Sequence, residues 1–293
     1  MEKRLFSGLL AAARLLPPYE AEAESNPPVY RVTDGAGHAL YLLGTIHAGR
    51  AEMYPLGGAA EEAYQNAGVL AVELDLYASG GNLLSAPESA ALLMYGPEDS
   101  IKNHLSPETC ALGMEAFAMP ERTLLRMKPA LWYSLAEHRI IAGAGLDAAQ
   151  GVDWRLLERA HEDGKRIDEL ESAALQMAAL LSIPENVIDR EVQAMLTCPE
   201  ESAQGMRALF EAWRQGDEEA LLSLLEESME EEDDLSGVLI HSRNDGFEER
   251  ALKYLNSGET ALIAVGAFHI IGKNGLAEKL ARAGCTVEKI ARG

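Results

Sequence analysis

The fold is indicated most clearly by residues 40–50, LYLLGTIHAGR. Four apolar residues run into a glycine, and a histidine, His47, follows three residues later. The same arrangement returns near the other end of the chain in ALIAVGAFHIIGKNG, residues 261–275, where the histidine is His269. Each stretch predicts a buried β-strand that ends at a glycine and then presents a histidine.

The residues around the first stretch predict alternating strands and helices. VYRV (29–32) and ALYLL (39–43) flank the turn residues DGAG, which is typical of a β-hairpin. PLGGAAEEAYQNA (55–67) has a helical pattern, and GVLAVELDL (68–76) is apolar until Glu73. Strand–helix–strand order favours a largely parallel or mixed sheet that is covered by helices on both faces.

The rest of the chain predicts a helical insertion and then a return to α/β structure. Periodicity is mostly helical from about residue 85 to 235, with Ser106 as a helix N-cap and RIDELES (166–172) as a short strand. The closing segments predict helix, strand, helix and strand in turn: RNDGFEERALKYLNSG, TALIAVGAFH, GLAEKLARAG and CTVEKI. We therefore expect one α/β domain over residues 29–293, with a helical insertion at about 85–235.

Residues 1–28 have two interpretations. The basic start, the apolar run and the small residues of AEAES resemble a secretory signal, but Glu2 and Arg14 interrupt that pattern. The alternative is an N-terminal helix followed by a Pro- and Glu-rich linker. A cytoplasmic protein is favoured, and a secreted or cell-envelope protein is expected if the segment acts as a signal. No other apolar run reaches 18 residues, so we expect no integral membrane segment.

Composition excludes some functions. Hydrophobic residues make up 47% of the 293 residues and charged residues 25%, as in an ordinary globular protein, but the formal net charge is −22. So acidic a chain repels phosphate backbones, and we expect no nucleic-acid partner. The cysteines Cys110, Cys198 and Cys285 lie far apart, which indicates neither a disulfide framework nor a zinc–thiolate site.

The two Gly-x-x-His elements, Gly44/His47 and Gly266/His269, predict a shared site. Ligands of parallel sheets bind at the carboxyl ends of the strands, and a glycine there lets the chain turn without a Cβ clash. A single such histidine would be structural, bonded to a backbone carbonyl. Two of them on neighbouring strands favour a common function.

Three charged residues join these candidates. Glu73 ends an apolar strand, where burial without a partner would cost several kcal/mol; Asp75, two residues later, is a second carboxylate or a helix cap. Glu171 ends the strand of RIDELES and is either functional or a cap for the next helix. Arg243 could bind a substrate carboxylate or an oxyanion, and the alternative is a surface salt bridge.

Two imidazoles and one or two carboxylates can hold a divalent metal. They can also act without one, with histidine as general base and glutamate orienting it. The spacing does not decide between these, because the residues are far apart in the chain. The sequence contains no HExxH helix, no GxSxG elbow and no phosphate-binding glycine loop.

Together these motifs resemble the TraB/GumN/PrgY family, whose animal relatives include the TIKI proteases that cleave Wnt proteins. The resemblance covers about Val29 to Ile290. It rests on five motifs in order: YLLGTIHAG, LAVELD, GVDWRLLERAHEDGKRIDELES with the following Gln176, SRND, and AVGAFHIIGKNGLAEKLARAGCTVEKI.

This resemblance implies a fold similar to erythromycin esterases and the ChaN haem-binding proteins, with a hydrolytic site made by the paired motifs. For the TIKI branch it implies peptidase activity supported by manganese or cobalt. The residues that match the family positions are His47, His269, Glu73, Arg243, Asp153 of the Gly-x-Asp element and Glu171 of the Leu-Glu element.

We therefore expect a metal-dependent hydrolase, most concretely a peptidase, acting on a peptide or small-molecule substrate. His47, His269 and Glu73 would hold a divalent metal, which is manganese or cobalt by resemblance or else zinc. Glu73 could instead take the proton of the bound water. The alternatives are a non-catalytic binder that sequesters a peptide signal or haem, and a metal-free esterase with His47 as base. The oligomeric state is left open.

Overall fold

The computed structural model of the chain describes residues 25–78, 91–228, 240 and 242–290. A six-stranded sheet in the order β4–β3–β5–β2–β1–β6 forms its centre. The strands are β1 Val29–Thr33, β2 Ala39–Thr45, β3 Val69–Val72, β4 Arg166–Glu169, β5 Ala261–Gly266 and β6 Thr286–Lys289. Strands β4, β3, β5 and β2 are mutually parallel, whereas β1 runs antiparallel to both β2 and β6. The prediction of an α/β fold with a mixed sheet is confirmed.

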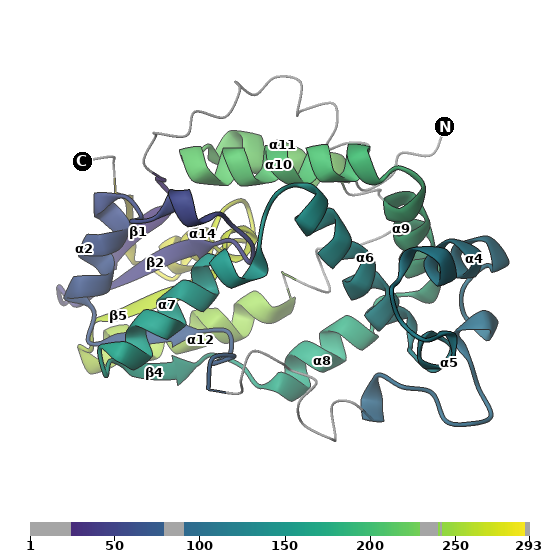
Figure 1. The fold of residues 1–293 in the computed structure, drawn as a ribbon. Coiled ribbons are helices and arrows are strands. Elements are labelled where there is room, and N and C mark those ends of the chain that lie inside the picture. The colour runs from purple at the N-terminus through teal and green to yellow at the C-terminus, as the bar shows by residue number, and fades with distance from the viewer. Residues whose placement is uncertain (1–24, 79–90, 229–239, 241, 291–293) are drawn as a thin grey trace.

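Helices cover both faces of this sheet. The helices closest to it are α2 Gly58–Asn66, α7 Val152–Glu162, α12 Ser242–Ser257, α13 Ala267–Ile270 and α14 Leu276–Arg282. Figure 1 shows α2 and α7 in front of the strands and α14 behind them. The central strands β2, β3 and β5 are buried along almost their whole length, because neither face meets solvent. The edge strands β4 and β6 are largely exposed.

The other helices form two runs, separated by α7 and β4. They are α4 Pro107–Ala116, α5 Glu121–Leu124, α6 Pro129–Gly143, α8 Ala173–Leu181, α9 Glu185–Thr197, α10 Pro199–Gln215 and α11 Glu218–Ser228, with short 3-10 turns at Ala51–Met53, Ile101–Asn103 and Ala148–Gln150. Helix α6 packs against α9 and α10, and α10 extends back over the sheet (Figure 1). The buried Trp213 of α10 donates from its indole Nε1 to the carbonyl oxygen of Gly44, 2.9 Å away. The helical part is thereby attached to the end of β2.

Local signals in the sequence set several element ends. Ser106 caps α4 by accepting a hydrogen bond from the backbone N–H of Thr109, as predicted. Gly164, two residues after α7, and Gly258, directly after α12, have φ values of +64° and +71°, where glycine avoids a Cβ penalty. The predicted strand over 68–76 is shorter in the structure, because β3 ends at Val72.

Two sequence predictions fall outside the described residues. These are the interpretation of the N-terminal segment up to residue 24 and the limits of the helical insertion at about residues 85 and 235. Within the described residues, no helix combines the length and apolar character needed to span a bilayer.

Candidate functional site

The two Gly-x-x-His elements meet at one edge of the sheet. Strands β2 and β5 are parallel neighbours, with Thr45 paired to Gly266. Both strands end at this level. Strand β2 continues into the turn that carries His47, and β5 continues directly into helix α13, which carries His269. Residues more than two hundred positions apart in the sequence are thus placed together.

Gly266 lies at the base of the site, where its side chains come together. A Cβ atom placed on this glycine would lie 3.7 Å from His47 Nε2, 3.7 Å from Glu73 Oε1 and 3.5 Å from His269 Cδ2. His269 Nε2 is itself 3.9 Å from Glu73 Oε1. Two imidazoles and a carboxylate therefore surround one small volume above the glycine.

His47 is held by a carboxylate. Its Nδ1 lies 2.8 Å from Asp153 Oδ2, and the other oxygen of Asp153 accepts from the Thr45 hydroxyl at 2.6 Å. Because a carboxylate only accepts, His47 donates from Nδ1 and turns Nε2 toward the site. The negative charge of Asp153 raises the pKa of His47 well above its ordinary value, against the opposing effect of desolvation. The side chain is nevertheless 70% exposed, because it borders an open cavity.

Gly151 explains how Asp153 reaches His47. The residue caps the start of α7, and its Cβ, if present, would lie only 2.4 Å from the backbone oxygen of His47. The next residue, Val152, donates its N–H to the carbonyl of Ile46 at 2.8 Å. The glycine of the Gly-x-Asp element thus permits the contact that places the carboxylate.

His269 is held differently, by an amide. Its side chain is 6% exposed, and its Nδ1 lies 2.7 Å from Asn244 Oδ1. The amide nitrogen of Asn244 donates to the carbonyl of Asn274 at 2.8 Å, so its oxygen is the atom that faces the ring. His269 therefore donates from Nδ1 and leaves Nε2 as an acceptor, 3.2 Å from Arg243 Nη1.

Glu73 follows directly after β3 and is 12% exposed. It accepts hydrogen bonds from the backbone N–H of Gly266 at 3.0 Å and from Gln176 Nε2 at 3.1 Å. Burial raises the pKa of this carboxyl. The electrostatic influence of His269, His47 and Arg243 and the hydrogen bond from the Gly266 N–H outweigh burial and bring the pKa of Glu73 down to about 2.

Arg243, near the start of α12, lies between the carboxylates of Glu73 and Glu171 and pairs with both. It is 16% exposed, so the alternative of a surface salt bridge does not describe it. Glu171 is 5% exposed and also accepts from Gln176 at 2.8 Å. The N-cap of the following helix is Ser172, so the alternative of Glu171 as that cap is wrong.

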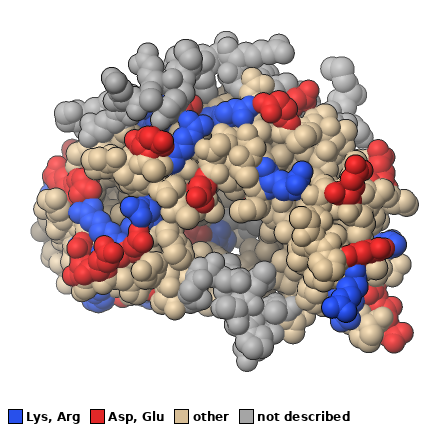
Figure 2. Space-filling view, viewed as in Figure 1, with Lys and Arg blue, Asp and Glu red and all other residues tan. Residues whose placement is uncertain are grey.

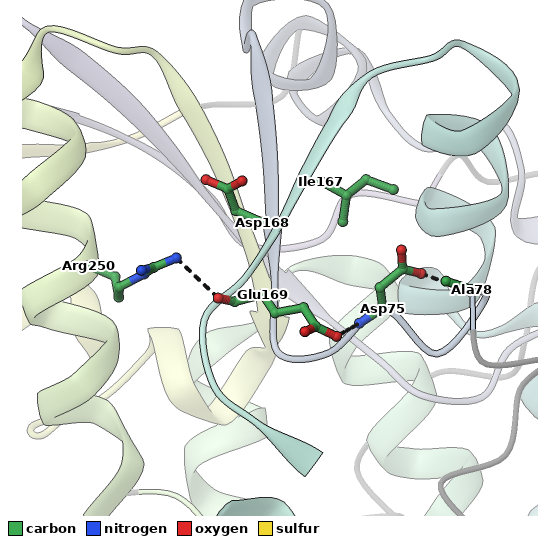
Figure 3. A pocket seen from close by; sticks show the side chains of 6 residues that line it. All are labelled: Asp75, Ala78, Ile167, Asp168, Glu169 and Arg250. Atoms are coloured by element: carbon green, nitrogen blue, oxygen red, sulfur yellow. Dashed lines mark hydrogen bonds between the residues drawn. The ribbon is translucent and has the colours of Figure 1, made fainter. Parts of the chain in front are cut away.

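Asp75 does not join this site. Its Oδ2 lies 2.8 Å from His161 Nε2, beside strand β4. There it borders a separate polar pocket of about 770 Å³, which Figure 3 shows. The side-chain carboxylate of Glu169 accepts a hydrogen bond from the backbone N–H of Asp75. The backbone carbonyl of Glu169 accepts one from Arg250. Asp168 pairs with an arginine of its own strand. The acids of this pocket are thus occupied by partners within the chain.

The site opens into a cavity of about 630 Å³, a volume typical of small-ligand sites. Figure 2 shows the face of the molecule hollowed between the sheet and the helical part. The polar residues that border the cavity include His47, Glu73, Asp153, Gln176, Arg243 and Glu137 of α6. Much of the remaining wall is apolar and includes Val72, Leu74, Trp154, Leu157, Met177 and Leu180.

The two imidazoles and the carboxylate are of the residue types that bind divalent transition metals. Metal-binding histidines commonly donate their second ring N–H to an oxygen acceptor, as both His47 and His269 do. Glu73 adds a carboxylate oxygen beside them. As placed, however, the described residues contain no group of three His, Cys, Asp or Glu side chains in metal-binding geometry, and the Arg243 guanidinium contacts the same atoms.

Some residues of the site were not found by the sequence reasoning. Asn244 follows Arg243 in SRND, Thr45 lies within the first motif, and Gln176 follows the third motif. Each acts by a hydrogen bond to a residue distant in the chain, so spacing carries no signal for it. Glu137 lies on α6 without any motif, and only the cavity identifies it.

The fold and site define an α/β protein in which two parallel strand ends present a bipartite histidine–carboxylate site. The chain belongs to the TraB/PrgY/gumN family, whose model matches residues 28–289. It is 28% identical over 258 residues to YbaP of Escherichia coli (strain K12), a protein described as uncharacterized, covering 86% of this chain and 92% of YbaP. YbaP of Shigella flexneri matches with the same identity and coverage. No solved structure matches, so the similarity to erythromycin esterases and ChaN stays a prediction.

Proposed function

We propose that this chain is a metal-dependent hydrolase, most concretely a peptidase, with His47, His269 and Glu73 at its centre. The observation that carries the proposal is the convergence of both Nε2-presenting histidines and Glu73 over Gly266. Nothing in the relatives' descriptions names a reaction, so the proposal rests on the geometry of this site and on the resemblance of its motifs to the TIKI branch.

In this proposal the Nε2 atoms of His47 and His269 and the carboxylate of Glu73 would hold a divalent cation. Such a cation supplies a bound water of lowered pKa and a Lewis acid for the scissile carbonyl. Asp153 and Asn244 fix the two rings so that Nε2 faces the site. Gln176 and Arg243 hold Glu73 in its ionised form.

Arg243 is also proposed to act on the substrate. It borders the cavity as well as pairing with Glu73 and Glu171, so its charge acts on whatever occupies the cavity. A guanidinium there stabilises negative charge that develops on a substrate oxygen. Its two carboxylate partners keep it in place and prevent reorganisation when that charge appears.

Metal-free hydrolysis is the second candidate, and the His47–Asp153 pair favours it. A histidine that donates Nδ1–H to a carboxylate and presents Nε2 to an open cavity has the arrangement of a general base once Nε2 is deprotonated, and the raised pKa of His47 places this activity at alkaline pH. Asp153 would stabilise the imidazolium that forms when His47 takes a proton. In this alternative Arg243 provides the positive charge that the metal would otherwise supply.

Peptide and ester hydrolysis assays test both candidates. Turnover that needs manganese or cobalt and is lost on chelation supports the metal-dependent peptidase, whereas ester turnover that survives chelation supports the second candidate. His47→Ala and His269→Ala should each abolish turnover, and His138→Ala, an exposed histidine of α6, should not. Saturable binding with peptide recovered intact, or a Soret band on haem titration, would instead indicate a binder. Unaltered turnover in both variants would contradict the site.

A further inference from the structure

Glu137 is the exceptional acid of the cavity. It projects from α6, in the helical part of the molecule, and borders the same cavity as His47 and Arg243. Glu73 and Asp153, the other acids of the cavity wall, each accept several hydrogen bonds or ion pairs. For Glu137 the described residues provide neither a hydrogen bond nor an ion-pair partner.

The apolar surroundings of Glu137 make an unpaired carboxylate unfavourable. Leucines and methionine from α7 and α8 form much of the wall, including Leu157, Met177 and Leu180. Burial raises the pKa of the Glu137 carboxyl, and His47 is the positive group that opposes this rise. A carboxyl without a partner in an apolar cavity is stabilised when a ligand brings a hydrogen-bond donor, above all a cationic one.

The charges of the cavity indicate which end of a substrate lies at Glu137. The ion pairs of Arg243 are with Glu73 and Glu171, and Glu137 lies outside them. His47 is likewise paired with Asp153. Glu137 is therefore the carboxyl of the cavity that no positive side chain neutralises by direct contact in the described part of the chain, and it favours an amino group over a carboxylate.

We propose that Glu137 binds the ammonium group of the substrate, while an apolar group of the substrate packs against the α7 and α8 wall at Leu157, Met177 and Leu180. This rests on the proposed function and deepens it by naming a substrate class: compounds with a free amino group next to an apolar side chain. The N-terminus of a short peptide and a small apolar amine share this chemistry. The cavity of about 630 Å³ accommodates either.

Binding measurements test the proposal without requiring turnover. Isothermal titration of the wild type with leucinamide should give saturable binding, whereas N-acetyl-leucinamide, which lacks the charge, should bind at least about tenfold more weakly. Glu137→Gln should remove this difference and leave the two affinities alike. Glu115→Gln, an exposed glutamate of α4 outside the cavity, is the matched control and should behave as the wild type.

A leucine-initiated tetrapeptide with a free N-terminus separates the two sources. Tighter binding of the tetrapeptide than of leucinamide identifies a peptide N-terminus, and equal binding identifies a small amine; Glu137→Gln should weaken either by a similar factor. Equal affinity of the wild type for leucinamide and its acetylated form, or no effect of Glu137→Gln, would overturn the proposal.

Metal content and kinetics keep this test separate from that of the proposed function. Glu137→Gln should retain the metal stoichiometry of the wild type, and where turnover is measured it should raise KM for free-amino substrates with little change in kcat. Loss of metal in Glu137→Gln would make the residue a ligand and overturn its role as an ammonium anchor. Absence of turnover in the wild type would contradict the hydrolase and leave the binding result standing.

Discussion

The two Gly-x-x-His elements look alike in sequence and differ in almost every physical respect in the structure. His47 is 70% exposed and bonded to the carboxylate of Asp153, whereas His269 is 6% exposed and bonded to the amide of Asn244. Both nevertheless donate from Nδ1 and present Nε2 to the same site. The shared feature is therefore the orientation of the ring, and the differing feature is the charge and burial of its partner.

This difference suggests a division of roles within one site. The exposed ring of His47, with a charged partner, is suited to meet substrate and to carry a proton. The buried ring of His269, packed edge-on against Phe247 and facing Arg243, is suited to fix the geometry of the site. The following predictions test whether the two halves differ as the structure indicates.

The largest effect is expected on the buried side, from Arg243→Met. Removing the guanidinium leaves the carboxylates of Glu73 and Glu171 close together and buried, which should destabilise the fold by about 3–5 kcal/mol. Without the cation one carboxyl of the pair should take up a proton more easily, so the loss should be greater at pH 8 than at pH 5. Urea unfolding at both pH values measures this. A loss that is independent of pH would argue against the carboxylate pair.

Acid should weaken the fold through Glu73. Its pKa is lowered to about 2 in the folded chain, so its ionised form contributes stability above the unfolded-state pKa, and this contribution is lost as the pH falls from about 4.5 toward 2. The contribution is on the order of 3 kcal/mol. Glu73→Gln should be less stable than the wild type at pH 7 and should lose less stability between pH 4.5 and 2. Parallel pH profiles of the two proteins would contradict the lowered pKa.

Alanine at the two histidines should separate their structural parts. His269→Ala removes the buried imidazole that contacts Asn244 and Arg243 and should cost about 1–3 kcal/mol of unfolding free energy. His47→Ala should stay within about 0.5 kcal/mol, because the ring is exposed. Thermal and urea unfolding give both values. Equal losses in the two variants would remove the proposed distinction between the halves.

Alanine at the two motif glycines should also have unequal effects on stability. A Cβ on Gly44 would lie 3.0 Å from the Cα of Ala267, a backbone atom, so Gly44→Ala should cost about 1–3 kcal/mol. Gly266→Ala meets only ordinary contacts and should cost less than about 1 kcal/mol. Its methyl group would nevertheless lie among the three site atoms and should reduce activity. Unfolding and turnover assays on both variants check this contrast.

Much of the fold was predictable because its signals are local. The hairpin at 29–43, the apolar strands before Gly44 and Gly266, and the cap at Ser106 follow from period, turn residues and capping chemistry within a few positions. Because strand ends of a parallel sheet meet at one edge, the nearness of His47 and His269 also followed from the pattern.

The contacts that distinguish the two histidines were not predictable. Asn244, Thr45 and Gln176 act through single hydrogen bonds to residues brought near only by the whole fold. The same holds for Arg243, whose neutralisation by two carboxylates depends on three separate segments. Closeness in the sequence is equally unreliable, as Asp75 shows. It is two residues from Glu73, but β3 ends at Val72, and the side chain of Asp75 contacts His161 instead of the site.

We propose that His47 and His269 form one metal-binding site. Its most direct test is the metal content, by mass spectrometry, of gently purified protein supplied with manganese and cobalt, for the wild type, His47→Ala and His269→Ala. A shared site predicts a stoichiometric transition metal in the wild type that is lost in both variants. A wild type without metal, or a metal that persists in either variant, would contradict it.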